Sequence, residues 1–249
     1  MSHKALVIPS SEQPRLPAHA LKVGGMTAFS ATDFPGKFAT TIFIQGCPWR
    51  CSYCHNPHLQ ERTVASAVPW EDILLFLRRR RGFIDVVVFS GGEPCIDPAL
   101  YAAIQEVKKM GFAVGLHTAC IYPRQLQKIL PLIDWVGFDV KTRLPDYPAL
   151  TSIDKSGASI LPCIEHILAS GVDYECRTTV HPSLLEEEAL LDLGKQLRDL
   201  GVKNYVVQQF RQTGCQDQAL NAQAHQAYPA AATLKELATY FDHFHYRTH

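Results

Sequence analysis

The chain has 249 residues, of which 47% are hydrophobic, so it can bury a substantial core as one large domain or two small ones. Lysine and arginine together number 24, as do aspartate and glutamate, and the formal net charge is therefore zero. A chain without net charge has no overall field to attract nucleic acid or an acidic membrane, and we expect neither partner. No apolar run reaches the length of about 18 residues that a membrane span needs, and the N-terminal residues do not form a signal peptide, so we expect a cytoplasmic protein.

The first twenty residues differ in composition from the rest of the chain. They are rich in proline, serine and polar residues, and they show no hydrophobic period. We therefore expect residues 1–20 to form a flexible N-terminal tail and residues 21–249 to form a single domain.

From residue 40 onward, short apolar runs alternate with longer segments of helical period. The short runs predict strands over 40–45, 85–90, 112–118, 135–141, 172–180 and 204–210. The intervening segments predict helices over 69–82, 98–110, 123–133, 159–170, 183–201 and 230–245. Strands that are apolar on both faces and alternate with helices of this length indicate a parallel sheet.

Six strand–helix units are two fewer than the eight that close a (β/α)8 barrel. We therefore predict an α/β fold in the form of an open, partial (β/α)6 barrel that is similar to part of a TIM barrel. A doubly wound sheet is the alternative, and the order of the elements does not decide between the two. In both architectures the functional residues lie at the C-terminal ends of the parallel strands.

Reactive or charged residues stand at the ends of five predicted strands. A cluster of cysteines follows the first strand, and Gly-Gly-Glu-Pro (91–94) follows the second. His117 lies at the end of the third strand, Asp139 and Lys141 end the fourth, and His181 follows the fifth. Because the ends of parallel strands meet at one rim, we expect these residues to form one site.

The chain contains eight cysteines, and only three of them are close in sequence. Cys47, Cys51 and Cys54 form the pattern C-x3-C-x2-C. Without a secretion signal, disulfides are not expected, and a cluster of thiols favours metal binding or catalysis. The other five are expected to be single buried apolar residues, and they are Cys95, Cys120, Cys163, Cys176 and Cys215.

Three thiolates are one fewer than a closed tetrahedral metal site requires. A structural zinc ion would need a fourth ligand, and His55, the nearest candidate, is adjacent to Cys54 in awkward geometry. A disulfide with one free thiol fits the compartment poorly, and an electron-transfer cluster ordinarily takes four thiolates. The fourth interpretation is a [4Fe–4S] cluster on three cysteines, with one iron open to a small-molecule ligand.

The cysteine motif, with Tyr53 just before its third cysteine, resembles the signature of the radical S-adenosylmethionine superfamily. The context is similar as well, because the motif follows a predicted strand and "SGGEP" ends the next one. The stretch "GGMTAFSATDFPGKFATTIFIQGCPWRCSYCHNPHL" resembles the activating enzymes of glycyl radical enzymes within that superfamily, as do "GLHT", "WVGFDVK" and "YECRTTVH". The similarity runs from Lys22 to Phe210 and is greatest to the activating proteins of anaerobic ribonucleoside-triphosphate reductases.

This resemblance implies the radical SAM fold and an oxidoreductase activity. It implies two cofactors, a [4Fe–4S] cluster held by Cys47, Cys51 and Cys54, and S-adenosylmethionine bound at the open iron. One electron from the cluster would cleave S-adenosylmethionine to methionine and a 5′-deoxyadenosyl radical, which would generate a glycyl radical on a partner protein. The implied partners are a glycyl radical enzyme, in particular anaerobic ribonucleoside-triphosphate reductase, and a low-potential electron donor such as flavodoxin or ferredoxin.

The resemblance also assigns further residues to the binding of S-adenosylmethionine. Gly91 and Gly92 lack side chains, so a ligand can approach the backbone closely at this strand end. The family binds the methionyl amino group at this segment, with Glu93 beside it. Tyr53 is expected to support the adenine, mainly through its backbone.

Two pairs of charged residues complete the predicted binding site. Asp139 and Lys141 are two residues apart and so lie on one face of a strand, where charges are costly unless they are paired. By resemblance both contact S-adenosylmethionine, and Lys141 suits its carboxylate. Arg177 and His181 are four residues apart and are expected to point the same way, toward the carboxylate or ribose of the ligand. The alternative for this second pair is a surface arginine and a loop histidine.

Three other segments have more than one interpretation. Some relatives have an aspartate that helps to hold a monovalent cation where this chain has His117, which puts cation binding in doubt. Residues 33–36 are expected to form a docking surface or the floor of the active site, or else a turn into the first strand. The four arginines at 78–81 are expected to stabilise the end of a helix, with partner docking as the alternative.

The alternatives to the implied function fall into two classes. The chain could be a radical S-adenosylmethionine enzyme that activates another glycyl radical enzyme, of the pyruvate formate-lyase type, or that acts directly on a small molecule. A protein of a different class would bind an iron–sulfur cluster or zinc without catalysis.

Overall fold

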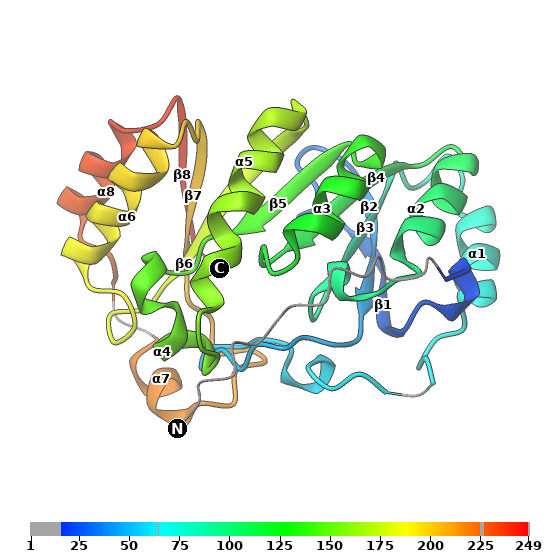
Figure 1. Cartoon of the computed structure of the whole chain (residues 1–249), viewed down its shortest axis with the longest axis horizontal. Coiled ribbons are helices and arrows are strands. Elements are labelled where there is room, and N and C mark those ends of the chain that lie inside the picture. The colour runs from blue at the N-terminus through cyan, green and yellow to red at the C-terminus, as the bar shows by residue number, and fades with distance from the viewer. Residues whose placement is uncertain (1–15, 64, 225–226, 249) are drawn as a thin grey trace, which may run out of the picture.

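The computed structural model describes residues 16–63, 65–224 and 227–248 of the chain. It contains one eight-stranded sheet in which the strands follow one another in chain order, from β1 at one edge to β8 at the other (Figure 1). The strands are β1 (Val23–Ser30), β2 (Ala39–Ile44), β3 (Val86–Gly91), β4 (Ala113–Thr118), β5 (Trp135–Asp139), β6 (Asp173–Val180), β7 (Asn204–Gln209) and β8 (His243–Arg247).

The helices alternate with the strands from β2 onward. They are α1 (Trp70–Arg79), α2 (Leu100–Lys109), α3 (Pro123–Ile129), α4 (Tyr147–Thr151), α5 (Ile160–Ser170), α6 (Glu187–Asp199), α7 (Gln218–Gln223) and α8 (Ala231–Ala238). None of the helices formed by the described residues is long and apolar enough to cross a membrane.

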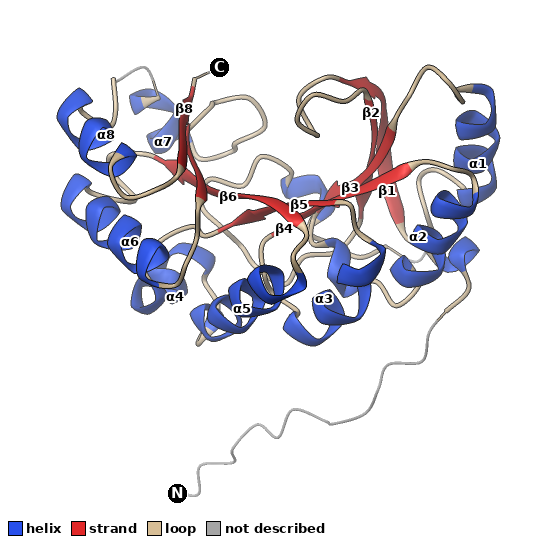
Figure 2. Cartoon of the chain, turned by 90° about the horizontal axis from the view of Figure 1, so that it is seen from above, coloured by secondary structure: helices blue, strands red, loops and turns tan. Residues whose placement is uncertain are grey.

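The sheet is curved but not closed. Figure 2 shows most of the helices along its outer side and an open concave side between β2 and β8. Strands β2 to β7 pair in parallel, so that Ile44 lies beside Gly91 and Asp139 lies beside Arg177. These six strands are the six that the sequence predicted, and the partial barrel is confirmed.

The sheet has one more strand at each edge than the sequence predicted. β1 pairs antiparallel with β2, and β8 pairs parallel with β7. β1 has no clear pattern in the sequence because it contains two glycines, and Val23 is its one buried residue. Its pairing is also irregular, with register shifts between Val23 and Gly25 and between Thr27 and Ser30.

The predicted helix over 230–245 is wrong in its second half. α8 ends at Ala238, and His243–Arg247 forms β8. Alternate residues of β8 differ in environment, since Phe244 and Tyr246 are half-buried and the residues on either side of them are exposed. This alternation of polar and aromatic residues has a period of two and was the signal for a strand.

The predicted tail over residues 1–20 lies mostly outside the described residues. Its last part, Ala18–Ala20, forms a 3-10 helix that packs against α1 and α2. Ala18 and the following Leu21 are buried in the hydrophobic core. The folded part of the chain therefore includes residues that we expected in the tail, because their apolar area adds to the core.

The loop between β1 and β2 folds back into the concave side of the sheet. The ring of Phe34 packs against that of Trp135, with the centroids 5.3 Å apart, and also contacts a small apolar cluster that includes Val86 and Val88. On the outer side, Phe89 and other strand residues pack against the helices in the main core. The loop therefore covers part of the concave side that no helix covers, and leaves the rest accessible.

A candidate active site at the C-terminal ends of the strands

A cavity of about 1010 Å³ lies on the concave side at the C-terminal ends of the strands. Its lining runs from Asp33 and Pro35 on the β1–β2 loop to His245 on β8. Two of the residues 33–36 therefore line the cavity, and the β1–β2 loop is called the floor loop below. Pockets that enclose small ligands have volumes of about 300–1,000 Å³. The predicted site residues that line the cavity are Cys47, Cys51, Cys54, Tyr53, Gly91, Gly92, Asp139, Lys141 and Arg177.

The three clustered cysteines lie on a loop whose backbone is held on two sides. Cys47 donates its amide N–H to the carbonyl oxygen of Gln60 at 3.0 Å, and Ser52 donates to that of Leu150 in α4 at 3.3 Å. The guanidinium Nη1 of Arg50 donates to the Cys47 carbonyl oxygen at 2.7 Å. The chain itself therefore holds the loop at the cavity wall.

The thiols of this loop are free and half-buried. Burial raises the pKa of Cys47 to about 12 and also raises the pKa of Cys51, and the nearby charge of Lys141 opposes both shifts. Without a metal, these two thiols are therefore protonated at neutral pH. Reactive catalytic cysteines have lowered pKa values, whereas a coordinating metal deprotonates a thiol outright, so these thiols suit metal binding better than nucleophilic catalysis.

The donor set fits an iron–sulfur cluster with one open iron. In the described part of the chain, no three His, Cys, Asp or Glu side chains come together as a single metal ion requires. Such convergence is needed for a tetrahedral zinc ion, whereas the cysteines of a [4Fe–4S] cluster each bind a different iron atom. Among the described residues, the cavity lining contains three cysteines and no fourth.

The five single cysteines are all buried, as predicted. Cys215 packs behind the cysteine loop with Tyr53, and its Sγ points to the Ser52 carbonyl oxygen at 3.8 Å. Cys95 lies against Glu93 in the core and not in the cavity. These residues contribute to packing, which is the role that the sequence indicated.

The end of β3 brings its backbone against that of β2. Gly91 has a φ of +120°, and a Cβ atom at this position would lie 2.4 Å from the backbone nitrogen of Ile44. Gly92 donates its N–H to the Ile44 carbonyl oxygen at 2.9 Å, and Glu93 donates to that of Gly46 at 2.8 Å. The glycines therefore allow β3 to contact the segment that leads into the cysteine loop, a packing role that the sequence did not reveal.

The side chain of Glu93 lies outside the lining of the cavity. It is fully buried and turns away from the cavity toward the end of β4. The carboxylate accepts hydrogen bonds from the Cys95 N–H at 3.1 Å, the Thr118 hydroxyl at 2.9 Å and the Ala119 N–H at 2.8 Å. Burial raises the pKa of Glu93, and these donors oppose the shift. Donors from its own loop and from the end of β4 take up the carboxylate, so Glu93 joins two strand ends and does not line the cavity.

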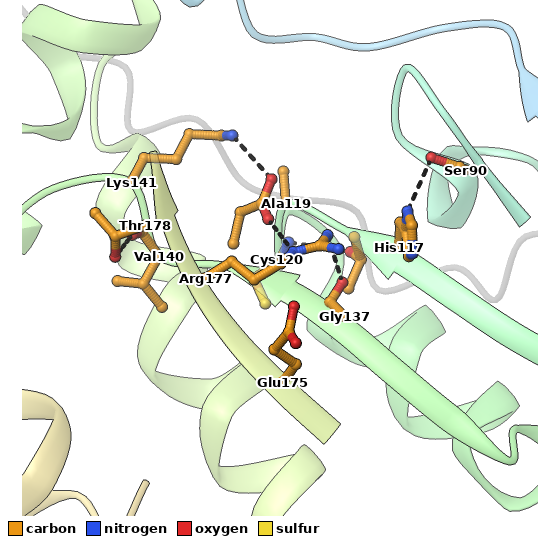
Figure 3. A network of polar contacts seen from close by, with 12 residues as sticks. Ser90, His117, Ala119, Cys120, Gly137, Val140, Lys141, Glu175, Arg177 and Thr178 are labelled. Atoms are coloured by element: carbon orange, nitrogen blue, oxygen red, sulfur yellow. Dashed lines mark hydrogen bonds and ion pairs between the residues drawn. The ribbon is translucent and has the colours of Figure 1, made fainter. Parts of the chain in front are cut away.

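Asp139, Lys141 and Arg177 form one network at the cavity wall (Figure 3). Arg177 approaches from β6 and binds Asp139 Oδ1 through Nε at 2.9 Å, and its Nη2 donates to the Gly137 carbonyl oxygen at 3.1 Å. Lys141 Nζ lies 3.3 Å from Asp139 Oδ2 and 5.4 Å from the centroid of the Tyr53 ring. The predicted pairing of these charges is therefore present, and it includes Arg177.

The network keeps a net positive charge. Burial by itself would raise the pKa of Asp139, but the charges of Arg177 and Lys141 outweigh this effect and lower it to about 2. Burial would lower the pKa of Lys141, but Tyr53 and Asp139 outweigh it and raise the pKa well above its ordinary value. At neutral pH, two cations therefore face one carboxylate, and the wall suits an anionic group of a ligand.

His181 is the second predicted residue that lies outside the cavity. Its Nε2 donates to the Leu220 carbonyl oxygen at 3.1 Å, and its Nδ1 accepts the Ser183 N–H at 3.2 Å. The ring also packs edge-on against Phe210, with the centroids 5.1 Å apart. β6 ends at Val180, so the period of two no longer applies at His181, and its side chain does not follow that of Arg177.

His117 is an uncharged residue of the cavity wall. Its Nε2 lies 2.8 Å from the carbonyl oxygen of Asp33, and because a carbonyl only accepts, Nε2 carries the proton. Its Nδ1 then accepts from the Ser90 hydroxyl at 3.4 Å, the contact drawn in Figure 3. Burial, together with the charge of Arg177, lowers the pKa of His117 to about 4. The ring therefore connects β4 to the floor loop in its neutral form.

The residues of the cavity wall opposite the β1–β2 loop were not predicted from the sequence. This wall is lined by Gln208 and Arg211 at the end of β7 and by His245 and Arg247 on β8. Arg247 Nη2 contacts Glu175 Oε2 on β6 at 3.0 Å. The alternation within β8 would have indicated a strand at this position, but no local signal marked Gln208 or Arg211.

The geometry can be compared with known proteins. A sequence model of the Radical SAM superfamily matches residues 41–207. A protein of Methanocaldococcus jannaschii, named as a glycyl-radical enzyme activating enzyme, is 31% identical over 208 residues, which cover 79% of this chain and 82% of that protein. The pyruvate formate-lyase-activating enzyme of Clostridium pasteurianum is 30% identical over 174 residues, which cover 67% of this chain and 71% of that enzyme.

Solved structures share the fold at low sequence identity. A radical SAM methyltransferase from Sphaerobacter thermophilus superposes with a TM-score of 0.61 at 16% identity, over 86% of this chain and 67% of that one. QueE from Escherichia coli superposes with a TM-score of 0.53 at 17% identity, over 92% of this chain and 94% of that one. At this identity the likeness supports the partial barrel and nothing beyond it.

The backbone contact at Gly91 predicts a large loss of stability for Gly91→Ala. The new Cβ would meet the Ile44 backbone and would also strain a positive φ, so we expect a loss of about 3 kcal/mol or more in the free energy of unfolding. Gly82→Ala is the matched control, because Gly82 has a φ of +81° but open space around it. Its loss should be about 1–2 kcal/mol. Urea unfolding followed by circular dichroism measures both, and equal losses would contradict the proposed contact.

The lowered pKa of His117 predicts how stability depends on pH. Between pH 6.5 and about 4 the unfolded chain binds a proton at this position and the folded chain does not. The contribution of His117 to stability is therefore fully present above pH 6.5 and is lost as the pH falls toward 4. We expect His117→Gln, which keeps a side-chain N–H donor, to have a shallower dependence in this range. Urea unfolding at a series of pH values tests this, and parallel curves for the two proteins would refute it.

Proposed function

The chain belongs to the radical SAM superfamily, and from this premise we propose that it generates a glycyl radical on a partner protein, with anaerobic ribonucleoside-triphosphate reductase as that partner. The observation that carries the proposal is the meeting of three free cysteines with the network of Asp139, Lys141 and Arg177 in one cavity. A three-thiol centre and a cationic wall are the two elements that binding of a cluster and of S-adenosylmethionine requires.

The protein is an enzyme, and its cofactors are a [4Fe–4S] cluster and S-adenosylmethionine, as in the superfamily to which it belongs. When both are bound, one electron from the reduced cluster would split S-adenosylmethionine into methionine and a 5′-deoxyadenosyl radical, which would remove a hydrogen atom. The protein contributes binding, orientation and the exclusion of water.

We assign the holding of the cluster to Cys47, Cys51 and Cys54. Backbone hydrogen bonds from Cys47 to Gln60 and from Ser52 to Leu150 hold their loop, which reduces the ordering that binding of a cluster requires. The partial burial that raises the pKa of Cys47 and Cys51 also limits the contact of their sulfur atoms with water. Low exposure of the sulfurs is one of the factors that set the reduction potential of such a cluster.

We assign the binding of the carboxylate of S-adenosylmethionine to Lys141 and Arg177 at the cavity wall. Asp139 orients both cations, and its single negative charge leaves the group with one net positive charge for the ligand. Backbone at Gly91 and Gly92 lines the same cavity and is accessible to the amino group. The ammonium group of Lys141 lies over the ring of Tyr53, and this cation–π contact restricts its position in the cavity.

The choice of partner is supported by sequence resemblance. One relative named as a glycyl-radical enzyme activating enzyme matches 79% of this chain, and the stretch from Gly24 to Leu59 resembles the activating enzymes of glycyl radical enzymes. Over the similar region from Lys22 to Phe210, the resemblance extends to the activating proteins of anaerobic ribonucleoside-triphosphate reductases. The second candidate partner is a pyruvate formate-lyase, because a pyruvate formate-lyase-activating enzyme is 30% identical. The electron donor in this proposal is a low-potential flavodoxin or ferredoxin.

Electron paramagnetic resonance tests the proposed partner directly. The protein, purified and reconstituted with iron and sulfide without oxygen, is incubated with a reductant, S-adenosylmethionine and either the reductase or the pyruvate formate-lyase of the same organism. We expect a glycyl radical doublet on the reductase together with release of 5′-deoxyadenosine. A doublet on the lyase alone would establish the second candidate. Release of 5′-deoxyadenosine with neither protein giving a doublet would reject both partners.

The three cysteines should be individually essential for the cluster. Cys47→Ala, Cys51→Ala and Cys54→Ala each remove one of three ligands, so we expect loss of bound iron and of its visible absorption, and no reductive release of 5′-deoxyadenosine. Cys163→Ala is the control, because Cys163 is buried in α5 and does not line the cavity. Loss of the cluster in this control, or its retention in any of the other three, would contradict the ligand assignment.

A further inference from the structure

β8 is both a wall of the cavity and the last strand of the sheet. His245, Tyr246 and Arg247 line the cavity, and β8 pairs with β7 on one side only. Figure 2 shows β8 and β2 on the two sides of the open concave space. β8 therefore borders the space that a segment of another protein would enter.

Two residues of β8 direct their backbone groups away from the sheet. His243 donates its N–H to the Lys203 carbonyl oxygen at 3.0 Å, on the side of β7. In a parallel strand the N–H and C=O of one residue point to the same side, and those of the next residue point to the other. His245 and Arg247 therefore also face β7, and Phe244 and Tyr246 present their N–H and C=O groups at the outer edge. Within the described part of the chain, no strand pairs with this edge.

The two edges of the sheet differ in regularity. β1 pairs with β2 through two register shifts, which bend and twist an edge and so protect it from pairing with another chain. β8 pairs with β7 over five consecutive residues, from His243 to Arg247, without a shift. The edge of β8, beside the cavity, is therefore regular enough to pair with another strand.

The concave wall next to this edge is polar. Glu175, Arg177 and Gln208 line the cavity on β6 and β7, and Arg247 reaches across to Glu175. The concave side of β3 instead carries Val86 and Val88 under the floor loop. A polypeptide backbone carries N–H and C=O groups that must be paired, so a polar wall beside a free edge suits an extended segment better than an apolar ligand.

We propose that the free edge of β8 pairs with an extended segment of the glycyl radical partner and so guides its glycine into the cavity. The inference rests on the proposed function, which requires a glycine-bearing segment to reach this cavity. Addition of a strand holds a segment through its main chain, while pockets select alternate side chains. Glycine has no side chain to recognise, so main-chain pairing is a mode of binding that can position it.

Two substitutions at Tyr246 distinguish the loss of main-chain pairing at the edge of β8 from the loss of the tyrosine side chain. Tyr246→Ala and Tyr246→Pro both remove the hydroxyl that donates to the Tyr228 carbonyl oxygen at 2.8 Å, but only proline also removes the outward N–H. Neither change removes an N–H that faces β7. We expect the rate of glycyl radical formation on the reductase to be about tenfold lower in Tyr246→Pro than in Tyr246→Ala, because one interface hydrogen bond is lost. Release of 5′-deoxyadenosine without the reductase should be equal in the two variants.

Amide hydrogen exchange of the unchanged holoenzyme gives a second readout that needs no variant. We expect exchange at Phe244 and Tyr246 to slow when the reductase is added, and exchange along β1 to be unaffected. Equal radical formation in the two variants, or unchanged exchange at Phe244 and Tyr246 while the wild type forms the radical, would overturn the pairing at β8 and leave the proposed function intact. Cleavage of S-adenosylmethionine by the wild type without a radical on the reductase would overturn the proposed partner, and this inference with it.

Discussion

A curved sheet that does not close has to cover the inner faces of its strands, and how it does so decides where the cavity lies. The outer faces pack against helices in the usual way of parallel sheets. On the inner side, the loop from β1 folds back and places Phe34 against Trp135 and the valines of β3. The rest of the inner side is lined by charged and polar residues, which tolerate water or a ligand. The cavity is the part of the concave side that this loop leaves accessible.

Within the cavity, burial decides the pKa shifts of two of the cysteines, whereas neighbouring charges decide those of Asp139 and Lys141. Burial raises the pKa of Cys47 and Cys51, so these thiols are neutral until a metal binds and deprotonates them. At the neighbouring strand ends, Asp139 holds Lys141 and Arg177 close enough that all three are charged despite their burial. A neutral thiol centre beside a fixed positive wall suits a site that binds a cluster on one side and the anionic end of a ligand on the other.

Glu93 and His181, the two predicted site residues that do not line the cavity, show the limits of prediction from a local sequence pattern. Glu93 follows the glycines directly, but its carboxylate is used within the protein by Thr118 and Ala119, which are far from it in sequence. His181 was placed by the period of two, but β6 ends one residue earlier and the ring turns to Leu220 and Phe210. In both cases the deciding partner comes from another element, and no spacing along the chain could indicate it.

The sequence by itself determined the six parallel strands, the cysteine motif and the meeting of several strand ends at one rim, because each depends on a repeating local pattern or on short spacing. It favoured the partial barrel over a doubly wound sheet, and the tertiary structure decided between them. The period of two in β8 was present in the sequence and was overlooked, whereas the tertiary structure decided the edge strand β1, which has one buried residue and no clear pattern. It also decided that His117 is a neutral link to the floor loop, and that Gln208, Arg211 and Arg247 complete the cavity. These features depend on contacts between distant segments, and such contacts exist only once the chain has folded.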